Sequence, residues 1–166
     1  MNLTTFLKSL DTLLMLIVKP IVITLCLIVA IGMTVGVFSR IIIGTPMFGL
    51  EEIILMTVMW LYMLGAVLAS RERSHLAADF VQVVSRNPKV IYFVHLLASI
   101  ISLIIAIYIS TWCYDLMTWA FAKKQTTPVF NLPWYYSQSS LFVASLFFLL
   151  YLVRDIFTDL GNLLKK

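Results

Sequence analysis

The sequence Phe48-Gly-Leu-Glu51-Glu52, followed by an uncharged segment over residues 53–70 and then by Arg71-Glu-Arg-Ser-His75-Leu-Ala-Ala-Asp79, decides the fold of this chain. The uncharged segment has the ~18 residues that a helix needs to cross the ~30 Å hydrocarbon core of a bilayer. The two glutamates stand at the expected helix start, where the helix dipole favours acidic side chains. Arg71, His75 and Asp79 are spaced by four, so a helix that continues past the membrane places them on one face. The stretch predicts one membrane crossing with polar chemistry at both ends.

The composition of the whole chain is typical of a membrane protein. Of its 166 residues 61% are hydrophobic and 12% are charged, and the mean hydropathy is +1.00, whereas soluble domains are about 25% charged. Uncharged segments cover residues 20–39, 53–70, 90–114 and 125–153. Each is long enough to cross a bilayer once and too short to cross it twice. We therefore expect an all-α integral membrane protein with four transmembrane helices and no room for an extramembrane catalytic domain.

The periodicity of apolar residues places the parts of a single membrane domain over residues 1–166. Residues 2–18 carry apolar side chains on one helical face and predict an amphipathic interfacial helix in the headgroup plane. Pro20 is expected to open the first span, because proline costs little at the first helical position. The predicted spans are 20–42, 48–70 continued to about residue 84, 88–113 continued to about residue 122, and 132–154 with an amphipathic C-terminal extension to residue 166.

The distribution of basic residues predicts the orientation of the chain. With the N-terminus inside, nine of the 12 Lys and Arg residues fall on the cytoplasmic side of the predicted spans. The positive-inside rule then places both termini in the cytoplasm. This surplus also suits anionic lipid headgroups, and it forms no clustered patch of the kind that indicates nucleic-acid binding. The three basic residues left outside are Arg40, Lys123 and Lys124.

The sequence contains no pattern for a catalytic, cofactor, metal or substrate site. It has no phosphate loop, no His/Cys metal set and no nucleophile paired with a base. Cys26 and Cys113 are expected to be unpaired packing residues, and His95 is expected to be a packing residue rather than a ligand. No charge falls at the middle of a span, where a transport site needs buried charges or broken helices. A chain of this kind is most simply an accessory or scaffold subunit.

Two features of the outer side allow more than one interpretation. If Gly44-Thr45-Pro46 makes a tight turn, Arg40 can pair with Glu51 or Glu52, or it can serve as a simple interfacial anchor. An aromatic cluster surrounds the Lys123-Lys124 segment and indicates either an interfacial belt or a docking surface for an outside partner. Its members are Trp119, Phe121, Phe130, Trp134, Tyr135 and Tyr136.

One set of residues resembles a known family. It consists of Arg40, Glu51-Glu52, Trp60, Gly65, Arg71, His75 and Asp79, followed by Asn87-Pro88. Together these are similar to the small membrane subunit (Q subunit, DctQ-type) of tripartite ATP-independent periplasmic (TRAP) transporters. The likeness in length and topology covers the whole chain, and the motif itself lies within residues 40–79. One departure is Gly49-Leu50, where the family often has an aromatic residue before the glutamate pair.

The resemblance implies a non-enzymatic scaffold subunit in the inner membrane of a bacterium. It implies a heterodimer with a large multi-span subunit that holds the sodium and substrate sites and moves as an elevator. That subunit would import a small organic anion, such as a dicarboxylate, a keto acid or a sialic acid, delivered by a periplasmic binding protein that docks on the outer face. The structural or interface residues would then be Arg40, Glu51, Glu52, Trp60, Arg71, His75 and Asp79.

Two other classes of function are compatible with four short spans. One is a haem- or quinone-associated membrane anchor of an oxidoreductase, which would use His75 and His95. The other is a small homo-oligomeric exporter, which ordinarily needs a carboxylate within a span, whereas Glu51 and Glu52 stand at an end.

Overall fold

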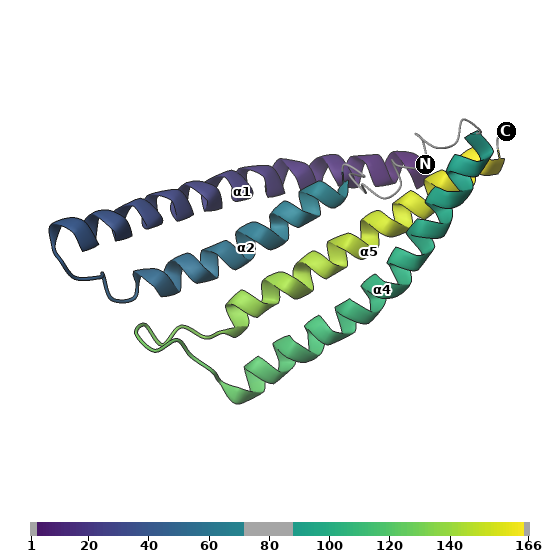
Figure 1. The fold of residues 1–166 in the computed structure, drawn as a ribbon. Coiled ribbons are helices and arrows are strands. Elements are labelled where there is room, and N and C mark those ends of the chain that lie inside the picture. The colour runs from purple at the N-terminus through teal and green to yellow at the C-terminus, as the bar shows by residue number, and fades with distance from the viewer. Residues whose placement is uncertain (1–2, 72–87, 165–166) are drawn as a thin grey trace. The chain divides into compact units, whose positions relative to one another are not determined.

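The chain is helical throughout the part that the structure describes. The computed structural model describes the backbone of residues 3–71 and 88–164, and the side chains of residues 15–71, 91 and 93–161. Within these ranges there are four helices, α1 (Leu3–Ile42), α2 (Leu50–Arg71), α4 (Pro88–Lys123) and α5 (Tyr135–Leu164), joined where described by short loops (Figure 1). The predicted all-α class is therefore confirmed.

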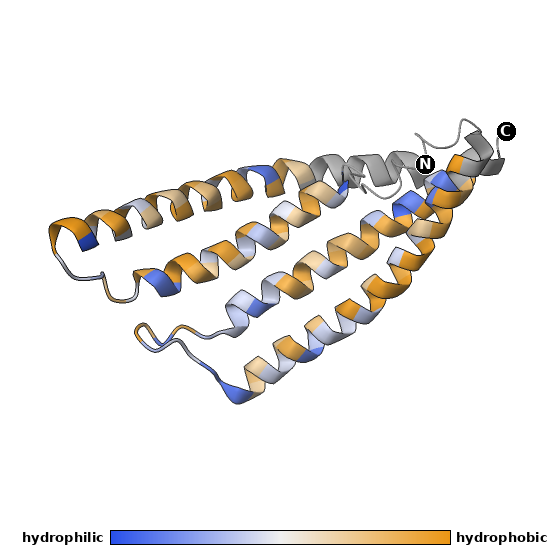
Figure 2. Ribbon diagram, viewed as in Figure 1, coloured by the Kyte–Doolittle hydropathy of each residue, from blue (hydrophilic) through white to orange (hydrophobic). Residues whose placement is uncertain are grey.

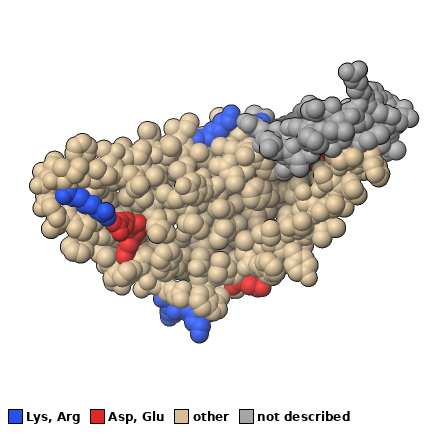
Figure 3. Space-filling view, viewed as in Figure 1, with Lys and Arg blue, Asp and Glu red and all other residues tan. Residues whose placement is uncertain are grey.

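Each of these helices contains a segment that is long and apolar enough to cross a membrane. The segments are Met15–Ile42, Leu50–Arg71, Phe93–Lys123 and Tyr135–Gly161. Apolar residues predominate along the helices in Figure 2, and charged side chains form only small patches on the face shown in Figure 3. The predicted number of spans is confirmed for the described residues, while the surface helix and the cytoplasmic termini stay predictions.

The first helix differs from its prediction at Pro20. We expected Pro20 at the first position of a new helix, but it lies inside α1, which is continuous over 40 residues. One interior proline costs a helix about 3 kcal/mol through a lost backbone hydrogen bond and a steric clash. The apolar pattern runs on across residue 20, and the many remaining backbone bonds of so long a helix outweigh that cost. The prediction of a helix start at Pro20 is wrong.

The remaining boundaries lie close to the predicted ones. α4 continues past Asp115 to Lys123, as expected, and α5 begins at Tyr135 and continues to Leu164, so the C-terminal extension is helical. The predicted continuation of the second span to residue 84 lies outside the described residues, as do His75 and Asp79.

The contacts divide the chain into two compact units. The first consists of residues 1–65 and 115–141, and the second of residues 66–114 and 142–166. In the first unit, Gly32 and Gly36 of α1 lie against Ile54 and Leu50 of α2, and an added Cβ would be 3.1 Å and 3.4 Å from these side chains. Small residues four apart let two membrane helices approach closely. These two glycines therefore serve the packing of α1 against α2 within this chain.

The second unit packs the end of α2 with α4 and α5. Its buried apolar side chains come mainly from α2 and α5, and they include Val67, Tyr151 and Leu152. Two acidic residues of α5, Asp155 and Asp159, are also buried. Among the described residues of the second unit, acidic side chains thus lie beside an apolar core.

Candidate functional site

The turn between α1 and α2 contains the predicted ion pair. Arg40, in the last turn of α1, pairs through Nη2 with Glu51 Oε1 in the first turn of α2. Both side chains are largely exposed, at 61% and 74%. The turn itself is fixed by Ser39, whose hydroxyl donates a hydrogen bond to the Thr45 carbonyl at 3.1 Å. An exposed pair of this kind contributes about 1 kcal/mol or less, so it orients the turn more than it stabilises the fold.

The loop between α4 and α5 is a tight hairpin built on Thr127. The Thr127 N–H donates to the Leu132 carbonyl at 2.9 Å, and the Leu132 N–H donates to the Thr127 hydroxyl at 3.0 Å. The Trp134 N–H donates to the Gln125 carbonyl at 3.0 Å. Asn131 takes a left-handed conformation, with φ of 52°, which asparagine tolerates better than most residues. The loop therefore holds its own shape and presents the N–H groups at its tip in a fixed direction.

Those N–H groups bind Glu52. Glu52 Oε1 accepts a hydrogen bond from the Val129 N–H at 2.7 Å, and Oε2 accepts one from the Phe130 N–H at 3.0 Å. Both carboxylate oxygens are thus used on the backbone of a loop that is 77 and 78 residues away in the sequence. Hydrogen bonds to an ionised group are shorter and stronger than neutral ones. We call this contact, made by Glu52, Val129 and Phe130, the Glu52 clamp.

Gly49 fits the clamp in two independent ways. Its φ of +85° lies in the left-handed region, which glycine adopts without steric cost. An added Cβ would also lie 2.2 Å from Cε2 of the Phe130 ring. Glycine therefore suits position 49, because the Phe130 ring occupies the space that a side chain would need.

Trp60 makes a contact between α2 and α5 in the same unit. Its indole Nε1–H donates to the Tyr136 carbonyl at 3.0 Å. The Tyr136 carbonyl lies in the first turn of α5. The indole bond thus joins α2 and α5 within their candidate spans.

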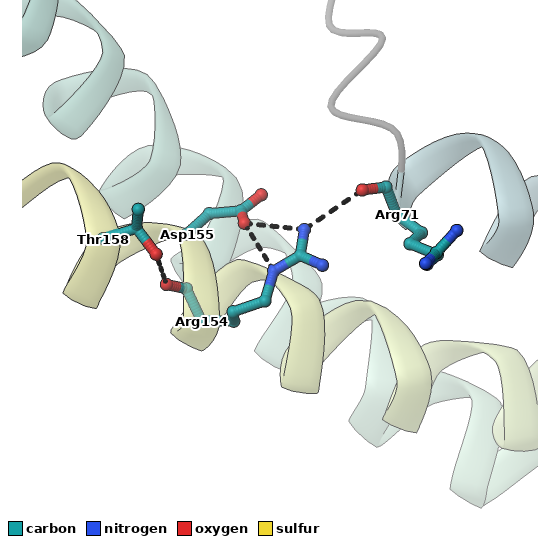
Figure 4. A network of polar contacts seen from close by, with 4 residues as sticks. All are labelled: Arg71, Arg154, Asp155 and Thr158. Atoms are coloured by element: carbon teal, nitrogen blue, oxygen red, sulfur yellow. Dashed lines mark hydrogen bonds and ion pairs between the residues drawn. The ribbon is translucent and has the colours of Figure 1, made fainter. Parts of the chain in front are cut away.

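A second polar cluster lies in the other unit and is centred on Arg154 (Figure 4). Arg154 Nη2 is 2.8 Å from Asp155 Oδ1 and donates to the Arg71 carbonyl at 3.1 Å, and Nε donates to the same Asp155 oxygen at 2.9 Å. The guanidinium carbon is 4.9 Å from the centre of the Tyr151 ring. This Arg154 cluster, formed by Arg71, Arg154, Asp155 and Tyr151, ties the end of α2 to α5.

The structure places four of the seven predicted site residues in the first unit. Arg40 and Glu51 form one pair, Glu52 forms the clamp, and Trp60 binds α5. Arg71 takes part in the Arg154 cluster through its carbonyl group, and its predicted neighbours His75 and Asp79 lie outside the described residues.

Sequence reasoning proposed the pairing of Arg40 with a glutamate but missed the partners of Glu52 and Arg71. Thr127, Arg154 and Asp155 were not predicted as site residues. The turn-forming residues around Thr127 and the spacing of Asp155 and Asp159 by four positions were available signals. The bonds from Val129 and Phe130 left no signal, because they come from the backbone.

The polar contacts given above join the described helices to one another. The remaining metal-binding and nucleophilic side chains of the described residues are considered next. Among them, no group of three or more His, Cys, Asp and Glu side chains could bind a metal ion. Cys26 and Cys113 are free thiols, the first exposed and the second half-buried. His95 is half-buried in α4.

The chain is similar to one family of membrane transport components. The family model described as "Tripartite ATP-independent periplasmic transporters, DctQ component" matches residues 28–162. The match begins within α1, ends within α5 and includes both polar clusters. No curated protein matches the chain.

Proposed function

This chain belongs to the DctQ family of TRAP transporter components, and from that premise we propose that it is the small scaffold subunit that braces a large, sodium-coupled elevator subunit. It is a multi-pass membrane protein with four candidate spans and, as a member of that family, a transporter component and not an enzyme. This membership favours the transporter interpretation over the haem- or quinone-associated anchor and over the exporter. The imported substrate in this proposal is a small organic anion, a dicarboxylate, keto acid or sialic acid, delivered by a periplasmic binding protein.

The Glu52 clamp is the observation that carries the proposal. A carboxylate at the start of a span is a candidate for binding a cation or a substrate, but Glu52 uses both oxygens on the Val129 and Phe130 N–H groups. The neighbouring Glu51 is paired with Arg40. The acidic groups in the first turn of α2 are thus bonded to other parts of this chain, the end of α1 and the α4–α5 loop, which suits a static brace better than a transport site.

The proposed orientation places the termini in the cytoplasm. The helix ends that carry Arg40 and Lys123, and the neighbouring Lys124, would then face the periplasm, where the binding protein docks. Arg71, His75 and Asp79 would lie at the cytoplasmic ends of the helices and contact the large subunit or lipid. Both assignments rest on the positive-inside rule and on the resemblance.

Matched substitutions in the two neighbouring glutamates test the proposal. Glu52→Gln replaces one acceptor oxygen with an NH₂ group that cannot accept the loop N–H bond. We expect the amount of co-purified large subunit and the rate of organic-anion uptake by the reconstituted complex to fall together, several-fold, with the relative rates for dicarboxylate, keto acid and sialic acid unchanged. Glu51→Gln is the control and should leave both quantities close to wild type, since it removes only an exposed pair.

The same measurements can contradict the proposal. A changed substrate preference in Glu52→Gln would assign this residue to substrate binding. Sodium-coupled uptake by the reconstituted chain alone would remove the scaffold role altogether.

A further inference from the structure

A groove in the first unit lies between α1 and α2, beside the turn that joins them. Its volume is about 340 Å³. The lining includes Met33, Val37 and Arg40 of α1, Met47 of the turn, and Glu51 and Ile54 of α2. The ion pair of Arg40 and Glu51 is therefore itself part of the wall. Figure 3 shows basic and acidic atoms side by side where α1 and α2 are joined.

The apolar part of the groove extends from this ion pair toward the middle of the candidate spans. Arg40 lies near the end of the span Met15–Ile42, and Glu51 lies at the start of the span Leu50–Arg71. Met33 precedes Arg40 by seven residues, which is about 10 Å along a helix. Met33 and Val37 are 57% and 56% exposed. The chain itself thus leaves an apolar wall uncovered at the depth where a bilayer supplies acyl chains.

Both members of the ion pair keep polar atoms for a ligand. Within the described residues, Arg40 is bonded through Nη2 and Glu51 through Oε1. No bond is made there by Nε or Nη1 of Arg40, or by Oε2 of Glu51. The mouth of the groove therefore presents unused donors of a cation next to an unused acceptor of an anion.

We propose that this groove binds a zwitterionic phospholipid, whose phosphate pairs with Arg40 and whose primary ammonium pairs with Glu51, while one acyl chain follows the apolar wall. A guanidinium fork matches phosphate oxygens geometrically, and an ammonium group donates to carboxylate oxygens. Beside the existing ion pair, such a headgroup completes a ring of alternating charges, in which each charge has opposite neighbours. A phospholipid without the ammonium would bring its phosphate near Glu51 with no cation to offset the repulsion.

Native mass spectrometry of the delipidated protein in detergent tests this site. The full-length chain, together with any subunit that co-purifies, is titrated with phosphatidylethanolamine and, separately, with phosphatidylglycerol of the same acyl chains. We expect one phosphatidylethanolamine adduct on this chain. Phosphatidylglycerol should bind about five-fold more weakly, which is what one exposed ion pair can supply. Equal or tighter binding of phosphatidylglycerol, or no phosphatidylethanolamine adduct on this chain, would overturn the proposal.

Two substitutions that break the same ion pair separate the headgroup contacts. Glu51→Gln removes the partner of the ammonium, so phosphatidylethanolamine binding should fall to the level of phosphatidylglycerol, whose own binding is not weakened. Arg40→Gln removes the partner of the phosphate and should weaken both lipids. If the ion pair only shaped the turn, both variants would change the two lipids alike. That result would contradict the headgroup assignment.

A matched pair of substitutions on α1 locates the acyl chain. Val37→Phe fills the groove and should weaken both lipids several-fold. Val35→Phe is the control, because Val35 is also exposed, at 41%, but lies outside the lining. Met33→Trp is a second filling variant if circular dichroism shows that Val37→Phe does not fold. Unchanged lipid binding in a folded filling variant would contradict the site, and loss of a co-purifying subunit with unchanged lipid binding would assign the groove to a partner helix.

This proposal does not rest on the scaffold role and can fail separately from it. The adduct is measured on the mass of this chain, whether or not a large subunit accompanies it. Loss of the phosphatidylethanolamine preference in Glu51→Gln, with an unchanged amount of co-purified large subunit, would support the lipid site and leave the proposed function as it stands.

Discussion

Replacing Gly49 by alanine should weaken the contact between the start of α2 and the α4–α5 loop. Gly49 has φ of +85°, and the left-handed region costs a non-glycine residue about 1–2 kcal/mol. The new Cβ would also lie 2.2 Å from one carbon of the Phe130 ring and 2.7 Å and 2.8 Å from two others. Real Cβ atoms do not approach so closely, so the ring or the loop must move, and such overpacking costs about 1–3 kcal/mol.

The sum predicts a loss of about 2–5 kcal/mol in the free energy of unfolding. For a chain of this size each kcal/mol lowers the melting temperature by about 2–4 °C. Thermal unfolding of the purified chain in detergent measures this shift. Because Phe130 also donates its N–H to Glu52, movement of the loop should weaken the clamp as well, which puts the result toward the upper end of the range.

Substitutions at two other glycines separate the backbone cost from the cost of the clash with the Phe130 ring. Gly44 has φ of +75° and nothing within 4 Å of an added Cβ, so Gly44→Ala should show the backbone cost alone, about 1–2 kcal/mol. Gly65 lies within α2 with open space around it, so Gly65→Ala should be neutral or stabilise by up to about 1 kcal/mol. The double variant Gly49→Ala/Phe130→Ala should lose less than the sum of its single variants, because the clash is absent. Equal losses in Gly49→Ala and Gly44→Ala would refute the argument from the Phe130 ring.

Three further substitutions test the other polar contacts. Trp60→Phe removes the N–H that bonds to the Tyr136 carbonyl. It should lower the free energy of unfolding by about 0.5–1.5 kcal/mol, measured by the same thermal unfolding. An unchanged melting temperature would mean that the bond does not form in solution. Arg40→Ala breaks the exposed pair with Glu51 and should cost less than about 1 kcal/mol at low salt, with the difference from wild type shrinking in 1 M salt; a salt-independent loss would contradict an exposed pair. Asp155→Ala leaves the preceding arginine without its nearly buried counter-charge and should cost about 3 kcal/mol, and a melting temperature within 2 °C of wild type would count against this estimate.

The number and approximate positions of the spans could be predicted because uncharged run length is a local property of the sequence. Four such runs became four helices with candidate spans among the described residues. Pro20 was misjudged for the opposite reason. Whether one proline starts a helix or lies inside it depends on whether the remaining stability of a 40-residue helix exceeds the local cost of the proline. The residues next to the proline do not decide this.

Some of the polar contacts could likewise be predicted from the sequence, and others could not. The pair of Arg40 with Glu51 could be proposed, since a short turn brings opposite side-chain charges together. The role of Glu52 could not, because its partners are backbone N–H groups of Val129 and Phe130 that are brought near by the fold. Backbone donors are present at every residue except proline, so the sequence gives no sign of which ones a distant carboxylate will meet.

The Glu52 clamp also bears on how the proposed brace would hold its helices in one register. A brace must resist sliding of its helices along one another, and apolar contacts alone resist this weakly, because one apolar surface replaces another at little cost. A carboxylate that bonds two N–H groups of a folded loop permits only one register, since a shift of one residue would leave its oxygens without partners. Placed at the end of a span, this bond fixes α2 against the α4–α5 loop without paying the cost of a charge at the bilayer centre. In the proposed brace, this bond at the end of α2 would fix the register of the first unit and leave its apolar surfaces available for a partner.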